Sequence, residues 1–273
     1  MSDKKKDLTP SVFYEDDAFM KGDFGRPVRL LAEYLGPLER FKDERVSDTI
    51  VMFGSARTKS QEEADAALTQ AQKSGEGLET AQMYMRNAKY YEAARELANR
   101  LTKWSRGIDK EKQRFVVCSG GGPGIMEAAN RGASEAGGKN IGLNIDLPFE
   151  QTDNPYISDE LNFNFYYFFM RKFWFISLAK AVIVFPGGFG TLDEFFEVMT
   201  LNQTGKLDYD IPIVLFGTDY WDRVLDMRVM VEEGYISPGD VDLFYRTNSI
   251  DDAYNHIVDD LSANAMDVPG LIL

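Results

Sequence analysis

The stretch Ala181-Val-Ile-Val-Phe-Pro-Gly-Gly-Phe-Gly-Thr191 decides the fold class. Its first five residues are apolar without polar alternation, which predicts a short strand buried on both faces of a parallel sheet. Pro-Gly-Gly ends the strand, and residues 192–202 have the apolar spacing of a helix. We expect Thr191 to open that helix, so a glycine-rich turn joins the end of a buried strand to the start of a helix.

The same order of strand, turn and helix recurs along the chain. Further strands are predicted at residues 49–53, 115–118, 141–145 and 213–216, with a last one near Phe244. Further helices are predicted at about 79–104, 124–136, 220–233 and 250–261, and the aromatic segment 161–169 is ambiguous and precedes a helix to Lys180. Buried strands that alternate with helices predict an α/β, Rossmann-like doubly wound parallel sheet, in which ligands bind at the carboxyl ends of the strands.

Two segments lie outside this pattern. Residues 1–47 are expected to form an N-terminal extension with one docking helix at 28–41, ahead of a Rossmann-like nucleotide-binding domain at 48–273. Gly36-Pro37 is expected to break or bend that helix, and its apolar face must dock on the main domain or on another subunit. Residues 59–78 are polar and form either an extra helix or a mobile insertion.

The composition excludes several classes of function. Of 273 residues, 44 are acidic and 30 basic, and the net charge of −14 repels nucleic acid and anionic membranes. A single cysteine and a single histidine, Cys118 and His256, exclude an intrachain disulfide and a His/Cys zinc cluster, and both are interpreted as structural residues. The N-terminal MSDKKKDLTP lacks the apolar core of a secretory signal, and no apolar run approaches the ~18 residues of a membrane span, so we expect a cytoplasmic protein.

Two glycine-rich loops follow predicted strands, at residues 120–124 and 186–191. Neither fits the G-x-G-x-x-G fingerprint of dinucleotide-binding folds, and the chain lacks the ATP-type P-loop. Gly187, Gly188 and Gly190 still allow backbone N–H groups to approach an anion, and the following helix N-terminus carries a partial positive charge. The 186–191 loop therefore predicts a phosphate site rather than only a tight turn, whereas the 120–124 loop alone fits a structural role equally well.

Glu194 has two interpretations that the sequence leaves open. Thr191-x-x-Glu194 fits a capping box, in which the glutamate side chain bonds back to the first amide of the helix. Alternatively, Asp193, Glu194 and Glu197 share one side of the helix, and a carboxylate one turn from a phosphate loop could meet a ribose.

Arg171 and Lys172 lie within an apolar run at residues 166–176. A buried arginine needs a carboxylate or a phosphate as a partner, so both cations are candidate ligand contacts. The alternative is that their long side chains reach solvent. Glu127, in the first turn of the helix after the 120–124 loop, either contacts a ligand or favours the helix dipole.

These segments resemble the lonely-guy (LOG) family. Pro186-Gly-Gly-Phe-Gly-Thr-Leu-Asp-Glu194 matches its P-G-G-x-G-T-x-x-E signature, and Met170-Arg171-Lys172 resembles its Arg-Lys motif, although the family often has two residues between Met and Arg. Ser119-Gly-Gly-Gly-Pro-Gly-Ile-Met-Glu-Ala-Ala-Asn130 resembles the glycine loop and helix of the longer members, and Gly54-Ser55-Ala-Arg57 resembles the turn after their first strand. The resemblance covers about residues 49–257.

The resemblance implies an enzyme that cleaves the N-glycosidic bond of a nucleoside 5'-monophosphate, AMP-like or a cytokinin riboside monophosphate, to a free base and ribose 5-phosphate. It implies that Arg171 and Glu194 are catalytic. The residues that it assigns to the nucleotide and its phosphate are Ser55, Gly121, Gly122, Glu127, Met170, Lys172, Gly187, Gly188, Gly190 and Thr191. It implies no cofactor and no metal, and at least a homodimer with sites near the subunit interface.

The alternative is a non-catalytic protein that binds a nucleotide or a phosphorylated cofactor, as a molybdenum cofactor carrier or a nucleotide sensor does. Such a protein needs the phosphate loop but not the pair Arg171 and Glu194, and the presence of both favours an enzyme. Members of the family have also been described as lysine decarboxylases, but the sequence shows no lysine set in a pyridoxal-phosphate context.

Overall fold

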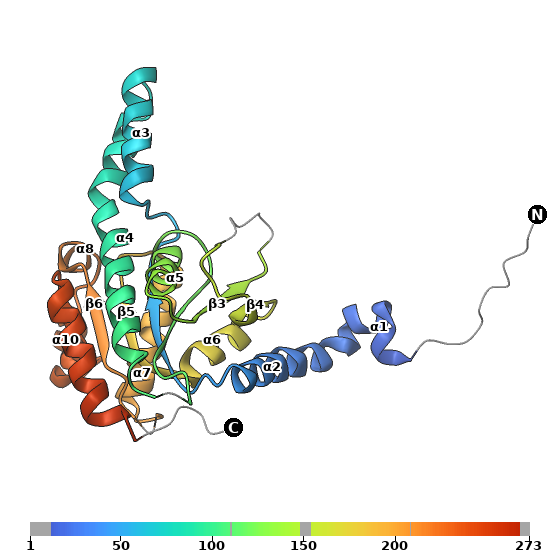
Figure 1. The fold of residues 1–273 in the computed structure, drawn as a ribbon. Coiled ribbons are helices and arrows are strands. Elements are labelled where there is room, and N and C mark those ends of the chain that lie inside the picture. The colour runs from blue at the N-terminus through green and yellow to red at the C-terminus, as the bar shows by residue number, and fades with distance from the viewer. Residues whose placement is uncertain (1–11, 110, 148–153, 208, 268–273) are drawn as a thin grey trace, which may run out of the picture.

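The computed structural model describes residues 12–109, 111–147, 154–207 and 209–267. In this part of the chain, seven parallel strands form one sheet in the order β4-β3-β2-β1-β5-β6-β7 (Figure 1). The strands are β1 (Thr49–Phe53), β2 (Val116–Ser119), β3 (Asn140–Ile145), β4 (Asn162–Phe165), β5 (Ala179–Val184), β6 (Ile213–Phe216) and β7 (Tyr245–Thr247). The predicted α/β, Rossmann-like sheet is confirmed, and the ambiguous aromatic segment contains edge strand β4.

Helices cover both faces of the sheet (Figure 1). The α-helices of the described ranges are α1 (Asp17–Lys21), α2 (Arg26–Asp43), α3 (Gln61–Ser74), α4 (Leu78–Ser105), α5 (Ile125–Glu135), α6 (Phe168–Ser177), α7 (Phe189–Gln203), α8 (Thr218–Val224), α9 (Arg228–Glu232) and α10 (Ile250–Asp260). Ile50 and Met52 of β1 belong to the apolar core that includes α4, α5 and α10, whereas Val51 and Phe53 belong to the core on the side of α6, α7 and α8. This alternation along a strand buried on both faces gives a three-layer domain.

The strand order places a topological switch point between β1 and β5. The chain builds β2, β3 and β4 outward on one side of β1, and then returns to pair β5 with the other side. Beyond the strands, the amide of Phe185 donates to the carbonyl of Phe53 at 2.8 Å, and the amide of Ser55 donates to the carbonyl of Pro186 at 3.0 Å. The turn after β1 and the glycine loop after β5 therefore lie side by side, at the position where open α/β sheets bind ligands.

Helix α2 runs unbroken through Pro37, so of the break or bend expected at Gly36-Pro37 the break is wrong. Proline has no N–H to donate to the carbonyl of Glu33 one turn earlier, and an unpaired carbonyl would normally weaken the helix. The indole N–H of Trp174 in α6 donates to that carbonyl at 2.9 Å. The rings of Tyr34 and Phe41 also pack against Trp174, with centroid distances of 5.7 and 5.3 Å. The N-terminal helix is thus docked on α6 by the same tryptophan that compensates for its proline.

The insertion at residues 59–78 forms helix α3 and the start of α4, which settles the alternative that the sequence left open. Ser60 and Glu63 form a capping box at the start of α3, and Gly75 and Gly77 adopt left-handed conformations in the turn to α4. The two helices pack along one another and project beyond the sheet (Figure 1). The same α4 continues along the sheet, so one continuous helix connects the hairpin to the core.

Two other helix boundaries differ from the sequence prediction. The segment predicted as one helix at 220–233 forms α8 and α9, because Leu225 adopts an extended conformation that ends the first. The helix before β5 ends at Ser177 instead of Lys180, since Ala179 already pairs with Thr49 of β1. Among the helices of the described ranges, none combines the length and apolar character that crossing a bilayer requires.

Candidate active site

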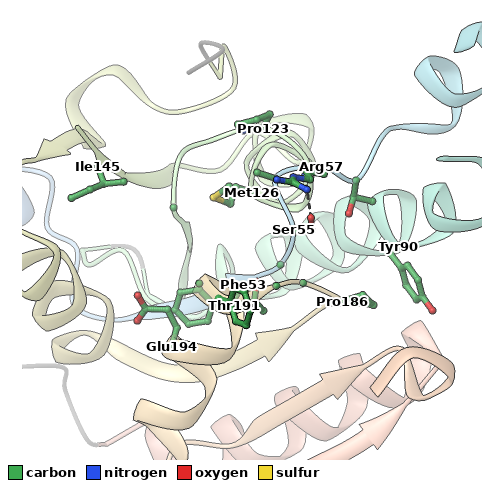
Figure 2. Close-up of a pocket in the computed structure, with 18 of the residues that line it drawn as sticks. Phe53, Ser55, Arg57, Tyr90, Pro123, Met126, Ile145, Pro186, Thr191 and Glu194 are labelled. Atoms are coloured by element: carbon green, nitrogen blue, oxygen red, sulfur yellow. Dashed lines mark hydrogen bonds between the residues drawn. The ribbon is translucent and has the colours of Figure 1, made fainter. Parts of the chain in front are cut away.

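A cleft of about 880 Å³ lies at the carboxyl ends of β1 and β5 (Figure 2). Its walls come from the turn after β1, the glycine loop after β5, and helices α4, α6, α7 and α8. The sequence-predicted residues that line it are Ser55, Arg171, Gly187, Gly188, Gly190, Thr191 and Glu194. The topological switch therefore brings together residues that are more than 100 positions apart in the chain.

The glycine loop starts its helix earlier than the sequence indicated. Helix α7 begins at Phe189 with Gly188 as its N-cap, so Thr191 is the third residue of the helix and does not open it. The first amides of a helix have no partner within the helix and point out from its N-terminus, where an anion is favoured. A Cβ at Gly187 would lie 2.1 Å from Oγ1 of Thr191, whereas a Cβ at Gly188 would meet no atom within 4 Å. Gly187 is thus needed for packing, and Gly188 leaves space in the cleft.

Glu194 is a buried carboxylic acid without a hydrogen-bond partner for one of its oxygens. Its side chain lines the cleft and the residue is 3% exposed, and Oε2 has no partner in the described structure. The capping box does not form, because Thr191 lies inside the helix rather than at its N-cap. Burial raises the pKa of Glu194 to about 7, although the charges of Lys172 and Arg171 oppose the rise.

Arg171 reaches the cleft from α6 and lies over two aromatic rings. Its guanidinium carbon is 5.5 Å from the ring centroid of Phe168 and 5.4 Å from that of Phe175. Burial lowers the pKa of Arg171, and the nearby Glu194 opposes that shift. The Nε atom of Arg171 is buried without a hydrogen-bond partner in the described residues. Arg171 is therefore a desolvated cation that faces the same cleft as the desolvated carboxyl group of Glu194.

Lys172 does not line the cleft. Its ammonium lies 2.8 Å from Oδ2 of Asp193 and 3.1 Å from Oε2 of Glu197. Consecutive residues on a helix point about 100° apart, so the two cations of α6 serve different groups. The pKa of Lys172 is raised: burial lowers it, but its ion pairs with Asp193 and Glu197 and the charge of Glu194 outweigh that effect. Lys172 thus neutralises the carboxylates that flank Glu194 and ties α6 to α7.

Other residues that the resemblance assigned to the nucleotide lie outside the cleft wall: Gly121, Gly122, Glu127 and Met170. The 120–124 loop enters the cleft through Gly120 and Pro123 instead. Gly121 has a φ of 73° and packs closely on Asn144, which is the structural role that the sequence left open for this loop.

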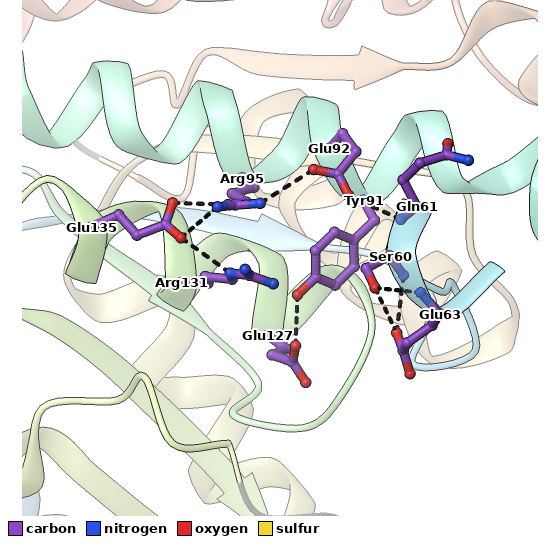
Figure 3. A network of polar contacts seen from close by, with 9 residues as sticks. All are labelled: Ser60, Gln61, Glu63, Tyr91, Glu92, Arg95, Glu127, Arg131 and Glu135. Atoms are coloured by element: carbon purple, nitrogen blue, oxygen red, sulfur yellow. Dashed lines mark hydrogen bonds and ion pairs between the residues drawn. The ribbon is translucent and has the colours of Figure 1, made fainter. Parts of the chain in front are cut away.

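Glu127 takes part in a polar network between helices (Figure 3). The hydroxyl of Tyr91 in α4 donates to Oε1 of Glu127 in α5 at 2.6 Å. Nearby, Glu135 of α5 accepts from Arg95 of α4 and from Arg131 of its own helix. These contacts hold α4 against α5, so Glu127 has a structural partner in Tyr91, whereas the sequence offered a ligand contact or a favourable position at the helix dipole.

The sequence did not assign a role to several residues that line the cleft: Arg57, Thr58, Asn87, Tyr90 and Tyr220. Tyr220, at the start of α8, donates its hydroxyl to the carbonyl of Gly187 at 2.6 Å and so supports the glycine loop. Nothing in the local sequence of α4 or α8 marks Asn87, Tyr90 or Tyr220, because only the packing of these two helices beside the loop brings them to the site.

The chain is similar to proteins of known family. A family model described as "Possible lysine decarboxylase" matches residues 126–257. Cytokinin riboside 5'-monophosphate phosphoribohydrolase LOG3 of Arabidopsis thaliana is 32% identical over 157 residues, which cover 56% of this chain and 67% of that protein. The probable cytokinin riboside 5'-monophosphate phosphoribohydrolase LOG6 of the same plant is 33% identical over 153 residues, which cover 55% of this chain and 71% of that protein. This chain belongs to the LOG family.

The matched segments span about two thirds of each plant protein. Among solved structures, the molybdenum cofactor carrier protein of Chlamydomonas reinhardtii superposes with a TM-score of 0.42 at 16% identity, over 79% of this chain and 99% of that chain, which is too remote to bear on function. The residues that line the cleft do not support the lysine decarboxylase activity that the description of the family model suggests. Within the described ranges no lysine lines the cleft: Lys172 is ion-paired beside it, and Lys180 is buried in β5 near the ring of Tyr209.

Proposed function

We propose that the cleft hydrolyses the N-glycosidic bond of a nucleoside 5'-monophosphate and releases a free base and ribose 5-phosphate. The observation that carries this proposal is the buried carboxyl group of Glu194, which lines the cleft with an unbonded oxygen and a pKa of about 7. Perturbed carboxyl groups in clefts are typical of catalytic sites. The names of the plant relatives support the reaction class.

The phosphate binds at the N-terminus of α7 in this proposal. The amides of the first turn and the open space at Gly188 and Gly190 suit a dianion, in a chain whose overall charge of −14 would otherwise repel it. Binding energy from the phosphate then positions the reacting carbon without taking part in the chemistry. Glu194 lies further along the same helix, so the ribose extends from the phosphate toward its carboxyl group.

The reaction breaks the bond between C1' and the base nitrogen, and the bonding electrons leave with the base. Positive charge develops on the ribose ring, as in the oxocarbenium-like transition state of glycoside hydrolysis. Ionised Glu194 stabilises that charge and orients the water that adds to C1', and the proton lost by the water ends on the base. Arg171 sits at the base side, where its charge favours departure of the electron-rich leaving group.

A second copy of the chain is the partner that we propose for the N-terminal helix. Helix α2 keeps an apolar stripe exposed while its other side docks on α6: Leu31 is 58% exposed and Leu35 is 54% exposed. Phe24, just before the helix, is 88% exposed. Large exposed apolar groups in one region mark interaction surfaces. Light scattering that reports a monomer at micromolar concentration would contradict this partner.

The activity is tested with AMP, GMP, CMP, UMP and IMP, by chromatography of the released base. The proposal predicts base release from at least one monophosphate. Binding of the monophosphates without any base release would instead support the alternative, a non-catalytic nucleotide-binding protein.

A further inference from the structure

The cleft continues past the phosphate loop on the side away from Glu194. Figure 2 shows Glu194 and Ile145 on one side of Ser55, and Tyr90 and Pro186 on the other. We call this second part the α4 lobe; it is lined by Thr58, Met83, Asn87, Tyr90, Pro186 and Tyr220. Pockets for drug-sized ligands span roughly 300 to 1,000 Å³. The cleft, at about 880 Å³, has room for a ligand larger than a nucleoside monophosphate.

The α4 lobe has fixed walls and polar groups that are available to a ligand. Tyr90 is 6% exposed, and Tyr220 is held by its hydrogen bond to the carbonyl of Gly187. The half-buried amide of Asn87 and the hydroxyl of Thr58, a residue 8% exposed, form no side-chain hydrogen bond within the described ranges. Neutral hydrogen-bonding groups beside the rings of two tyrosines suit an uncharged polar ring such as a sugar.

Arg57 is an exposed residue that lines the same cleft and directly precedes Thr58 of the α4 lobe in the turn after β1. Its backbone amide donates to Oγ of Ser55 at 3.1 Å, which fixes the turn that carries it. In the part of the chain that the structure describes, no carboxylate forms an ion pair with Arg57, although acidic residues outnumber basic ones by 44 to 30. The other cation that lines the cleft, Arg171, lies beside Glu194. Arginine binds phosphate through paired N–H groups, so Arg57 suits an anion at the entrance of the α4 lobe.

We propose that the cleft binds nucleotides that extend beyond the 5'-phosphate, with Arg57 on a second phosphate and a sugar ring in the α4 lobe. The ligand class is a nucleoside diphosphate sugar. The inference rests on the proposed function, because that function places the ribose at Glu194 and the first phosphate on α7. Helix α4 supplies Met83, Asn87 and Tyr90, so α4 determines this specificity.

The test is isothermal titration calorimetry with AMP, ADP and ADP-glucose on the full chain carrying Glu194→Gln, which slows turnover. ADP-glucose is expected to bind at least tenfold more tightly than AMP. Arg57→Ala should weaken ADP and ADP-glucose at least tenfold and AMP less than threefold, and Asn87→Leu should weaken only ADP-glucose. Arg100→Ala is the matched control: Arg100 is a cation of α4 that pairs with Asp251 outside the cleft, and its loss should change none of the three affinities.

Two results would overturn the inference. One is ADP-glucose binding no more tightly than AMP; the other is Arg57→Ala weakening AMP and ADP-glucose equally, which would assign Arg57 to the 5'-phosphate. Neither result depends on catalysis. If wild-type protein releases base from AMP while ADP-glucose binds no better than AMP, the hydrolase proposal stands and the α4 lobe proposal fails. If ADP-glucose binds tightly but wild-type protein releases no base from AMP, the α4 lobe proposal stands and the hydrolase proposal fails.

Discussion

Replacing Glu194 by glutamine is expected to lower activity and raise stability at the same time. The amide keeps the shape of the side chain but cannot carry the negative charge that the transition state needs. Side chains that act as general bases or electrostatic stabilisers contribute about 10²- to 10⁴-fold to the rate. We therefore expect kcat for AMP to fall by about two to four orders of magnitude.

The gain in stability follows from the raised pKa of Glu194. The value rises from 4.5 to about 7, and each unit corresponds to about 1.4 kcal/mol. Between these pH values the folded state holds a proton that the unfolded state has lost, so the free energy of unfolding decreases as pH rises from 4.5 to 7. Above pH 7 the ionised form costs the folded state about 3 kcal/mol, and below pH 4.5 it costs nothing. Glutamine removes this cost at high pH.

The assay is thermal unfolding of wild type and Glu194→Gln at pH 8 and at pH 5, together with base release at pH 8. For a domain of this size, about 3 kcal/mol raises the midpoint by roughly 6 to 12 °C, and the difference should shrink at pH 5. The reasoning is refuted if the variant is less stable than wild type at pH 8 and retains near-normal turnover. That pattern is expected of a helix-capping glutamate without a role in catalysis.

Three further predictions concern the surroundings of Glu194. In wild type, kcat/KM for AMP should fall about tenfold per pH unit below pH 7, because Glu194 acts as a carboxylate; a flat pH–rate profile contradicts this. Lys172→Met should move that inflection to higher pH, since Lys172 lowers the pKa of Glu194. The phosphate of AMP also ionises near pH 6, but it does so equally with both proteins, so the difference between their two profiles reports the pKa of Glu194. Gly187→Ala should lower the unfolding midpoint, because the Cβ of the new alanine would clash with Thr191. Gly188→Ala should unfold at the same temperature as wild type and only weaken AMP binding. Equal unfolding midpoints for the two variants would contradict this prediction.

The sequence predicted the features that depend on neighbouring residues in the chain. The buried strand and glycine turn at residues 181–191 are encoded in consecutive residues, and so is the helix that follows. The start of that helix was misplaced by two residues because glycine usually lies outside helices, yet Gly190 is tolerated in the first turn, where few helical hydrogen bonds exist.

The rest depended on contacts between distant segments. Pro37 predicted a break in α2, and only the indole of Trp174, 137 positions later, explains why the helix continues. Asn87 and Tyr90 lie on a helix whose local pattern shows only amphipathicity, so their place in the cleft follows from the strand order and not from a motif. The raised pKa of Glu194 likewise follows from its burial in the folded protein, which the local sequence does not encode.

The central claim is that Glu194 and the N-terminus of α7 act on the same nucleotide. A crystal structure of the Glu194→Gln variant with AMP tests it most directly. We expect the phosphate on the amides that follow Gly188, with C1' of the ribose facing the side chain at position 194. A phosphate bound elsewhere, or a ribose that points toward Tyr90 and away from position 194, would contradict it.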